Sequence, residues 1–181
     1  MTEKKRRNKE AALEKRKVFR IIAAVLAWVV TVAWGCFIYS MSAEDSVQSG
    51  KTSGKVVESV AGVVIPNYNK LPENEKNEVK SKLSLPIRKL AHFSEFAVLG
   101  ALIMTSVRLT FDRKFMIAYY ISSSAVLGIL YAILDELHQA SVPGRAPRVA
   151  DVLIDSGGVI CGVALVTLII LLIERKRRLI T

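Results

Sequence analysis

Four long apolar runs constrain the fold of this 181-residue chain more than any other feature of its sequence. Each run holds about 20 residues, the length that a helix needs to cross the hydrocarbon of a bilayer. The buried helices of soluble proteins are usually shorter and amphipathic. We therefore predict an all-α membrane protein, folded as a bundle of four transmembrane helices. The predicted spans are about 21–39, 87–108, 115–134 and 152–173.

Three basic segments predict the orientation of these spans. Arm 1–20 contains nine Lys or Arg and three Glu, and loop 108–114 and tail 174–181 are also basic. Together they carry a net charge of +11, whereas the whole chain carries +10. Because Lys and Arg are retained on the cytoplasmic side, we expect a multi-pass protein of the cell membrane with both termini cytoplasmic. Segment 41–85 is then extracytoplasmic.

The domain organisation follows from these spans. Arm 1–20 is interpreted as disordered and solvated, with no folded partner that would indicate nucleic-acid binding. The run 21–39 is longer than the core of a signal peptide, which has about 7–15 residues, so we expect an uncleaved anchor. The chain then divides into the arm, a membrane domain over 21–173 and the tail 174–181.

The extracytoplasmic segment 41–85 is polar, but two parts of it predict helices. Apolar residues at helical spacing, Val57, Val60, Ala61 and Val64, indicate a short helix on the membrane surface. The sequence Pro72-Glu-Asn-Glu75 is typical of the acidic first turn of a second helix. The second span is expected to start near Pro86, because proline is favoured at the first helical position.

Polar residues gather where the second, third and fourth spans reach the outer face. Charge at the edge of a membrane is costly to keep, so we predict that these residues share a wet, ion-lined basin. The candidate catalytic residues are His92, Glu95, Asp135 and His138. The candidate substrate-binding residues are Arg88, Glu136, Gln139, Arg145, Arg148, Asp151 and Asp155.

Local spacing predicts how parts of this basin are built. Val142-Pro-Gly-Arg145 fits a turn in which proline fixes one central residue and glycine permits the positive φ of the next. That turn directs Arg145 back over the helix ends. Further along, Gly158 and Gly162 form a G-x-x-x-G seam, which allows close helix packing within the chain or, alternatively, a homo-oligomer.

Two other interpretations of the cluster remain open. His-x-x-Glu and Asp-x-x-His pairs suit a divalent metal, but three nearby arginines disfavour a cation, so no metal is predicted and the cofactor is unknown. Mutual neutralisation is the structural alternative, because buried charges need partners. It pairs Glu95, Asp135, Glu136, Asp151 and Asp155 with Arg88, Lys89, Arg145 and Arg148.

In combination these motifs resemble the VanZ family of bacterial membrane proteins. The likeness covers roughly residues 35–165 and includes Phe37-Ile-Tyr-Ser-Met-Ser42. It rests on Arg88-Lys-x-Ala-His-Phe-x-Glu95, Asp135-Glu-x-x-Gln139-x-x-x-Pro-Gly-Arg145 and Asp151-Val-Leu-Ile-Asp155-Ser-Gly-Gly158. The resemblance implies an integral protein of a Gram-positive cell envelope, related to a protein that confers low-level teicoplanin resistance. It supplies no agreed activity, cofactor or catalytic residue.

Two functions compete. In the first, the arginines bind or help to remodel an anionic membrane lipid, a lipid-linked wall precursor or a glycopeptide-type drug. In the second, the chain is a membrane-embedded hydrolase or transferase in which His92 or His138 is the general base, oriented by Glu95 or Asp135. A transporter is the weaker third reading, because four spans are few and an oligomer would be needed.

Overall fold

The computed structural model describes residues 3–44, 46–111 and 116–180, and these residues form helices and no strand. The elements are α1 (Glu3–Ser42), α2 (Ser46–Val64), the 3-10 helix η1 (Tyr68–Lys70), α3 (Glu73–Thr110), α4 (Ile117–Gln139) and α5 (Val149–Ile180). Helices α1, α3, α4 and α5 are long and apolar enough to cross a membrane. The prediction of an all-α protein with four membrane helices is therefore confirmed.

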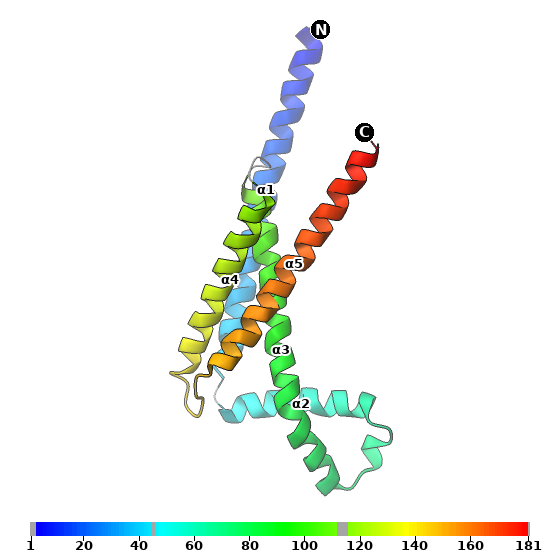
Figure 1. Ribbon diagram of the computed structural model, residues 1–181, viewed down its shortest axis with the longest axis vertical. Coiled ribbons are helices and arrows are strands. Elements are labelled where there is room, and N and C mark those ends of the chain that lie inside the picture. Colours follow the sequence, from blue (N-terminus) through cyan, green and yellow to red (C-terminus); the bar gives the residue numbers. More distant parts are fainter. Residues whose placement is uncertain (1–2, 45, 112–115, 181) are drawn as a thin grey trace.

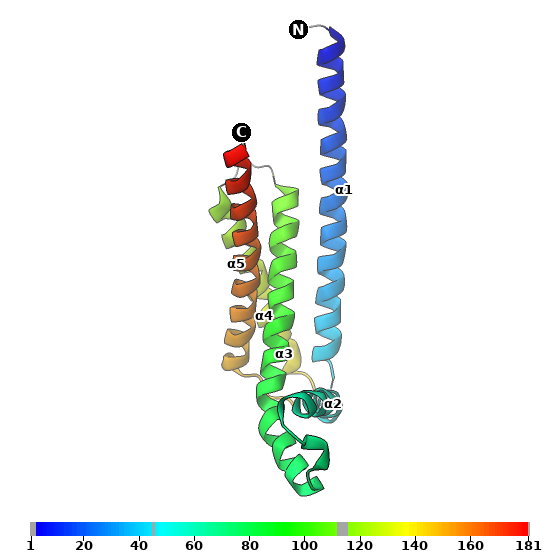
Figure 2. The same cartoon turned by 90° about the vertical axis from the view of Figure 1, so that its right-hand side faces the viewer.

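The four long helices run alongside one another, and the N and C termini lie at the same end of the bundle (Figure 1). Helix α2 crosses the opposite end, roughly perpendicular to the bundle axis, and the first turns of α3 project beyond it (Figures 1 and 2). We call the end that carries α2 the α2 end. The cytoplasmic placement of the termini stays a prediction.

Helix α1 corrects the interpretation of the basic arm. From Glu3 onward the arm is helical and continuous with the first span, rather than disordered. Charged pairs one turn apart support this helix, namely Arg6–Glu10 at 3.7 Å and Lys17–Glu14 at 2.9 Å. A sequence that is polar on all sides thus extends a membrane helix, because the span has already nucleated it.

Helix α3 corrects the expected start of the second span. The acidic turn after Pro72 does begin a helix, with Glu73 and Glu75 in its first turn, but that helix continues without a break to Thr110. Pro86 lies inside it and removes the hydrogen bond to the carbonyl of residue 82. Both residues are exposed, so water can satisfy that carbonyl, and the helix survives.

Helix α2 confirms the short helix expected from the apolar spacing. Val57 and Ala61 are fully buried, whereas Val60 and Val64 are exposed. The buried pair packs towards the projecting part of α3, where Lys80 lies 3.4 Å from Glu58. Helix α2 is therefore packed against α3 at the α2 end of the bundle.

The α3–α5 interface is the most extensive in the bundle and depends on glycine. A Cβ atom on Gly158 would collide with the carbonyl oxygen of Phe93, and one on Gly162 with that of Ala97. The seam is thus used for packing within the chain. The predicted loop residues Asp112, Arg113 and Lys114 lie outside the described part of the structure.

Candidate functional site

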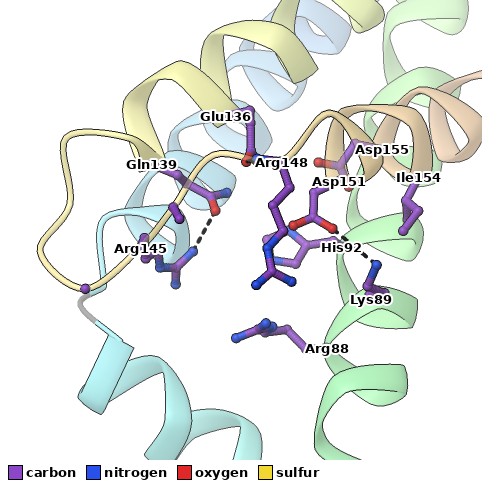
Figure 3. Close-up of a pocket in the computed structure, with 12 residues that line it drawn as sticks. Arg88, Lys89, His92, Glu136, Gln139, Arg145, Arg148, Asp151, Ile154 and Asp155 are labelled. Atoms are coloured by element: carbon purple, nitrogen blue, oxygen red, sulfur yellow. Dashed lines mark hydrogen bonds and ion pairs between the residues drawn. The ribbon is translucent and has the colours of Figure 1, made fainter.

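A polar cavity of about 130 Å³ lies at the α2 end, between α3, α4, α5 and the loop that joins α4 to α5 (Figure 3). We call this cavity the basin. Eight of the eleven residues predicted for the site line it: Arg88, His92, Glu136, Gln139, Arg145, Arg148, Asp151 and Asp155. The other three, Glu95, Asp135 and His138, do not line it.

The end of α4 holds one wall of the basin through a chain of hydrogen bonds. Asp135 is 3% exposed, and its Oδ2 accepts hydrogen bonds from Ser42 Oγ and Gln139 Nε2, both at 2.8 Å. Gln139 Oε1 in turn accepts one from Arg145 Nη1 at 2.9 Å. Asp135 therefore positions Arg145 from behind the basin rather than facing a ligand.

The predicted turn after α4 is present. Arg145 N donates to Val142 O at 3.2 Å, and Gly144 has a φ of 76°, which favours glycine. The turn brings the Arg145 guanidinium back over the basin, as expected. Burial, followed by the positive charge of Arg88, lowers the pKa of Arg145 from its ordinary value. Two guanidinium groups that repel one another would both gain from a shared anion.

The carboxylates of the basin differ in their partners. Glu136 Oε1 accepts the backbone N–H of Arg148 at 2.5 Å, which ties the loop to the end of α4. Asp151 lies 3.4 Å from the ammonium of Lys89. Glu136 Oε2 and Asp155 Oδ1 are buried and have no hydrogen-bond partner among the described residues.

Of the two histidines, only His92 faces the basin. Its Nδ1 lies 3.8 Å from Glu95 Oε2 and has no hydrogen-bond partner in the described chain. Glu95 itself lines an adjoining cavity of about 140 Å³. The ring of His138 instead stacks on Tyr39 of α1, with ring centroids 4.2 Å apart. The structure therefore does not bring His92 and His138 together.

Ser42 and Tyr39 were not predicted as site residues, and Lys89 was predicted only as a partner in mutual neutralisation. Ser42 and Tyr39, at the end of α1, contact Asp135 and His138, and Lys89 pairs with Asp151 across the α3–α5 contact. The signal for Ser42 was a hydroxyl at the end of the first span, at the same depth as Asp135. Ser42 and Tyr39 both lie in the motif Phe37-Ile-Tyr-Ser-Met-Ser42, which does not by itself indicate contacts with Asp135 or His138.

Mutual neutralisation accounts for little of the charge. The only basin ion pair between a carboxylate and a Lys or Arg side chain in the described residues is Lys89–Asp151. The guanidinium groups of Arg88 and Arg148 form no such pair there. Within the same residues, no three His, Cys, Asp or Glu side chains are grouped so that they could hold a metal ion.

Comparisons with known proteins place this arrangement in a family. The family model described as VanZ/LLP1 matches residues 27–171 of the chain, which include all of α3 and α4, parts of α1 and α5, and every residue that lines the basin. Neither a curated protein nor a solved structure matches the chain.

Proposed function

Since the chain belongs to the VanZ/LLP1 family, we propose that this multi-pass membrane protein binds the anionic head group of an amphiphile in its basin, at the outer leaflet. The amphiphile is a membrane lipid or a lipid-linked wall precursor. A glycopeptide-type drug, which also carries a carboxylate, is a ligand of the same kind. Binding such a drug would connect the basin to teicoplanin-type resistance.

The single observation that carries this proposal is the set of guanidinium groups at the basin. Arg88, Arg145 and Arg148 reach it from α3 and from the loop after α4 (Figure 3). Arg88 and Arg148 have no carboxylate partner in the described chain. Guanidinium groups bind phosphate and carboxylate through paired, charge-assisted hydrogen bonds, so an anion would join groups that otherwise repel.

The surroundings of the basin favour an amphiphile over a soluble anion. The adjoining cavity shares Arg88, His92 and Arg145 with the basin, and much of its remaining wall is apolar. Those apolar side chains are Met41, Val56, Ile87 and Ala91. A head group at the arginines would thus have an apolar surface beside it for the first part of its tail.

Lipid binding by the purified chain tests the proposal. Short-chain phosphatidylglycerol is titrated calorimetrically into the full chain in an uncharged detergent. The double variant Arg88→Gln/Arg148→Gln should bind at least about tenfold more weakly, because two charge-assisted contacts are lost. A matched control, Arg175→Gln/Arg178→Gln, removes two exposed charges at the far end of α5 and should bind as the wild type does. Equal affinity in all three proteins would overturn the proposal.

The outer-leaflet placement has its own test. Cys36 and Cys161 are replaced by Ala, and single cysteines are then introduced at Ser141, in the loop beside the basin, or at Arg175, near the C terminus. A membrane-impermeant thiol reagent applied to intact cells should label position 141 and not position 175. The opposite pattern would place the basin on the cytoplasmic side.

An enzyme acting on the same amphiphile is the second candidate, and one observation favours it. His92 lines the basin beside the arginines, and its Nδ1 lies 3.8 Å from Glu95 Oε2, so a carboxylate is near enough to orient the ring of a general base. In that case His92→Gln abolishes turnover of a bound lipid and leaves its affinity unchanged. His138→Gln serves as the control, because His138 lies against Tyr39 outside the basin. Absence of any turnover by the wild type leaves binding as the function.

A further inference from the structure

The charges of the basin are sorted by depth. Glu136 and Asp155 are 6% and 2% exposed, whereas Arg88 and Arg148 are exposed. In Figure 3 the carboxylates lie on the side of the basin towards the bundle, and the guanidinium groups lie on the side towards α2. The basin therefore has a cationic mouth and an acidic floor, and a ligand that fills it meets both.

The floor has acceptors that the chain leaves without donors. Glu136 and Asp155 both line the basin, and Glu136 Oε2 and Asp155 Oδ1 are buried and have no hydrogen-bond partner among the described residues. Lys89 also lines the basin, but its ammonium group lies 3.4 Å from Asp151 and forms its ion pair there. A buried carboxylate oxygen without a donor is unfavourable, so these two oxygens call for a donor from outside the chain.

Resting on the proposed function, we infer that the head group is zwitterionic: its anion lies at the arginines of the mouth, and a protonated primary amine lies between Glu136 and Asp155. An ammonium supplies three N–H donors and a positive charge, so one group can satisfy both carboxylates. A hydroxyl supplies one donor and leaves the charge uncompensated. The class of ligand is thus a phosphate ester that carries a free amine.

The same geometry predicts what the basin rejects. A quaternary ammonium has the charge but no N–H group, and its methyl groups need more room in a cavity of about 130 Å³. A purely anionic head group leaves the two floor oxygens without donors, which is the way a site built for a hydrogen bond discriminates against an analogue that lacks it. Selectivity therefore comes from the floor, and attraction to the anion comes from the mouth.

A matched pair of ligands tests the inference. Short-chain phosphatidylethanolamine and phosphatidylpropanol share the same phosphodiester and differ by an ammonium in place of a methyl group. Calorimetric titration of the full chain in an uncharged detergent should give at least about tenfold tighter binding of the amine. Phosphatidylcholine should bind no better than phosphatidylpropanol. Free phosphoethanolamine in a further arm distinguishes a lipid from a soluble phosphate ester: equal affinity there supports the zwitterionic class and assigns it to a soluble molecule.

Neutral substitutions in the floor complete the design. Asp155→Asn should weaken the binding of phosphatidylethanolamine and abolish its preference over phosphatidylpropanol. Glu136→Gln should act in the same direction, and it provides the test if Asp155→Asn does not fold. Glu78→Gln is the control, because Glu78 is exposed on α3 and pairs with Lys82 away from the basin.

The outcomes separate the two proposals. Equal affinity of the wild type for the amine and the propyl lipid, with both weakened by Arg88→Gln/Arg148→Gln, overturns the zwitterionic head group and leaves anion binding in place. A preference for the amine that persists in both floor variants overturns it as well. If neither lipid binds the wild type more tightly than the arginine variant, the proposed function itself is wrong.

Discussion

The two ends of the bundle treat buried polar side chains in opposite ways. Towards the termini, the hydroxyls of Thr31 and Ser106 are hydrogen-bonded at 2.9 Å, and Ser124 Oγ lies 3.6 Å from Met104 Sδ. Trp28, nearby, donates its indole N–H to a threonine hydroxyl. At the α2 end, buried oxygens of Asp135, Glu136 and Asp155 have no partner in the described chain.

This difference separates stability from function. In a membrane, a buried polar group without a partner costs free energy that neither lipid nor water recovers. Among its described residues, the half near the termini has no buried polar side chain without a partner, as expected of a region that only holds helices together. The basin half contains such unpartnered groups and is less stable for it. This is expected of a binding site, where a ligand supplies the missing contacts and function is retained at the expense of stability.

The largest change in stability should come from disrupting the close α3–α5 contact at the glycine seam, which runs through both halves of the bundle. Gly162→Leu places a side chain against the backbone of Ala97, and backbone cannot move aside as a flexible side chain can. We expect the free energy of unfolding in detergent to fall by about 3 kcal/mol or more, or the protein not to accumulate. Chemical unfolding followed by circular dichroism measures this loss.

The control for this variant is Gly62→Leu in α2. A Cβ atom at Gly62 meets nothing within 4 Å, so this substitution should leave stability almost unchanged. If both variants were equally stable, the close α3–α5 contact would be wrong, and the basin that depends on it would be wrong too.

The second largest change in stability should be a gain rather than a loss. Asp155→Asn removes an unpartnered buried carboxylate and keeps the volume of the side chain, so the ligand-free protein should gain about 1 to 3 kcal/mol of stability. Asp151→Asn is the matched control, because Asp151 is half-buried and paired with Lys89, and its loss should bring no gain. Destabilisation by Asp155→Asn in lipid-free detergent would show that the chain already satisfies this carboxylate.

Much of the helical fold could be predicted from the sequence, because the signals for the helices, the turn and the glycine seam are local. Span length gave four membrane helices, the Pro143-Gly144 dipeptide gave the turn, and the spacing of Gly158 and Gly162 gave a tight seam. Each of these depends on neighbouring residues and on geometry that a helix or a turn imposes. Eight of the predicted site residues reached the basin because three helix ends had to meet at one depth.

The rotation of each helix could not be predicted. Membrane helices are apolar on nearly every side, so no polar stripe shows which face turns towards which neighbour. As a result, the contact of Asp135 with Ser42, 93 positions away, and the stacking of His138 on Tyr39 were not foreseen. The continuous helix through Pro86 was not predicted, because proline inside a helix usually costs free energy by removing a backbone hydrogen bond. At this exposed site water can satisfy the carbonyl that is left without a donor.

A smaller effect is expected from the half near the termini. Ser106→Ala removes the hydrogen bond to Thr31, whose hydroxyl keeps its bond to Ala27 O at 2.8 Å. The loss of stability should be about 1 kcal/mol, typical of one hydrogen bond between membrane helices. Ser122→Ala, which affects an exposed hydroxyl bonded within its own helix, should change nothing measurable. A gain in stability from Ser106→Ala would remove the contrast between the two ends.

The smallest effect on stability should come from the mouth of the basin. Arg148 is exposed, its guanidinium has no ion pair in the described chain, and it holds Glu136 only through its backbone N–H, which glutamine keeps. Arg148→Gln should therefore change the free energy of unfolding by less than about 0.5 kcal/mol, while weakening the binding of an anionic lipid. Thermal unfolding and calorimetric titration of one preparation measure both quantities. A clear loss of stability would show that Arg148 stabilises the fold. A loss of affinity without a loss of stability would show that the arginines at the mouth of the basin serve to bind the ligand.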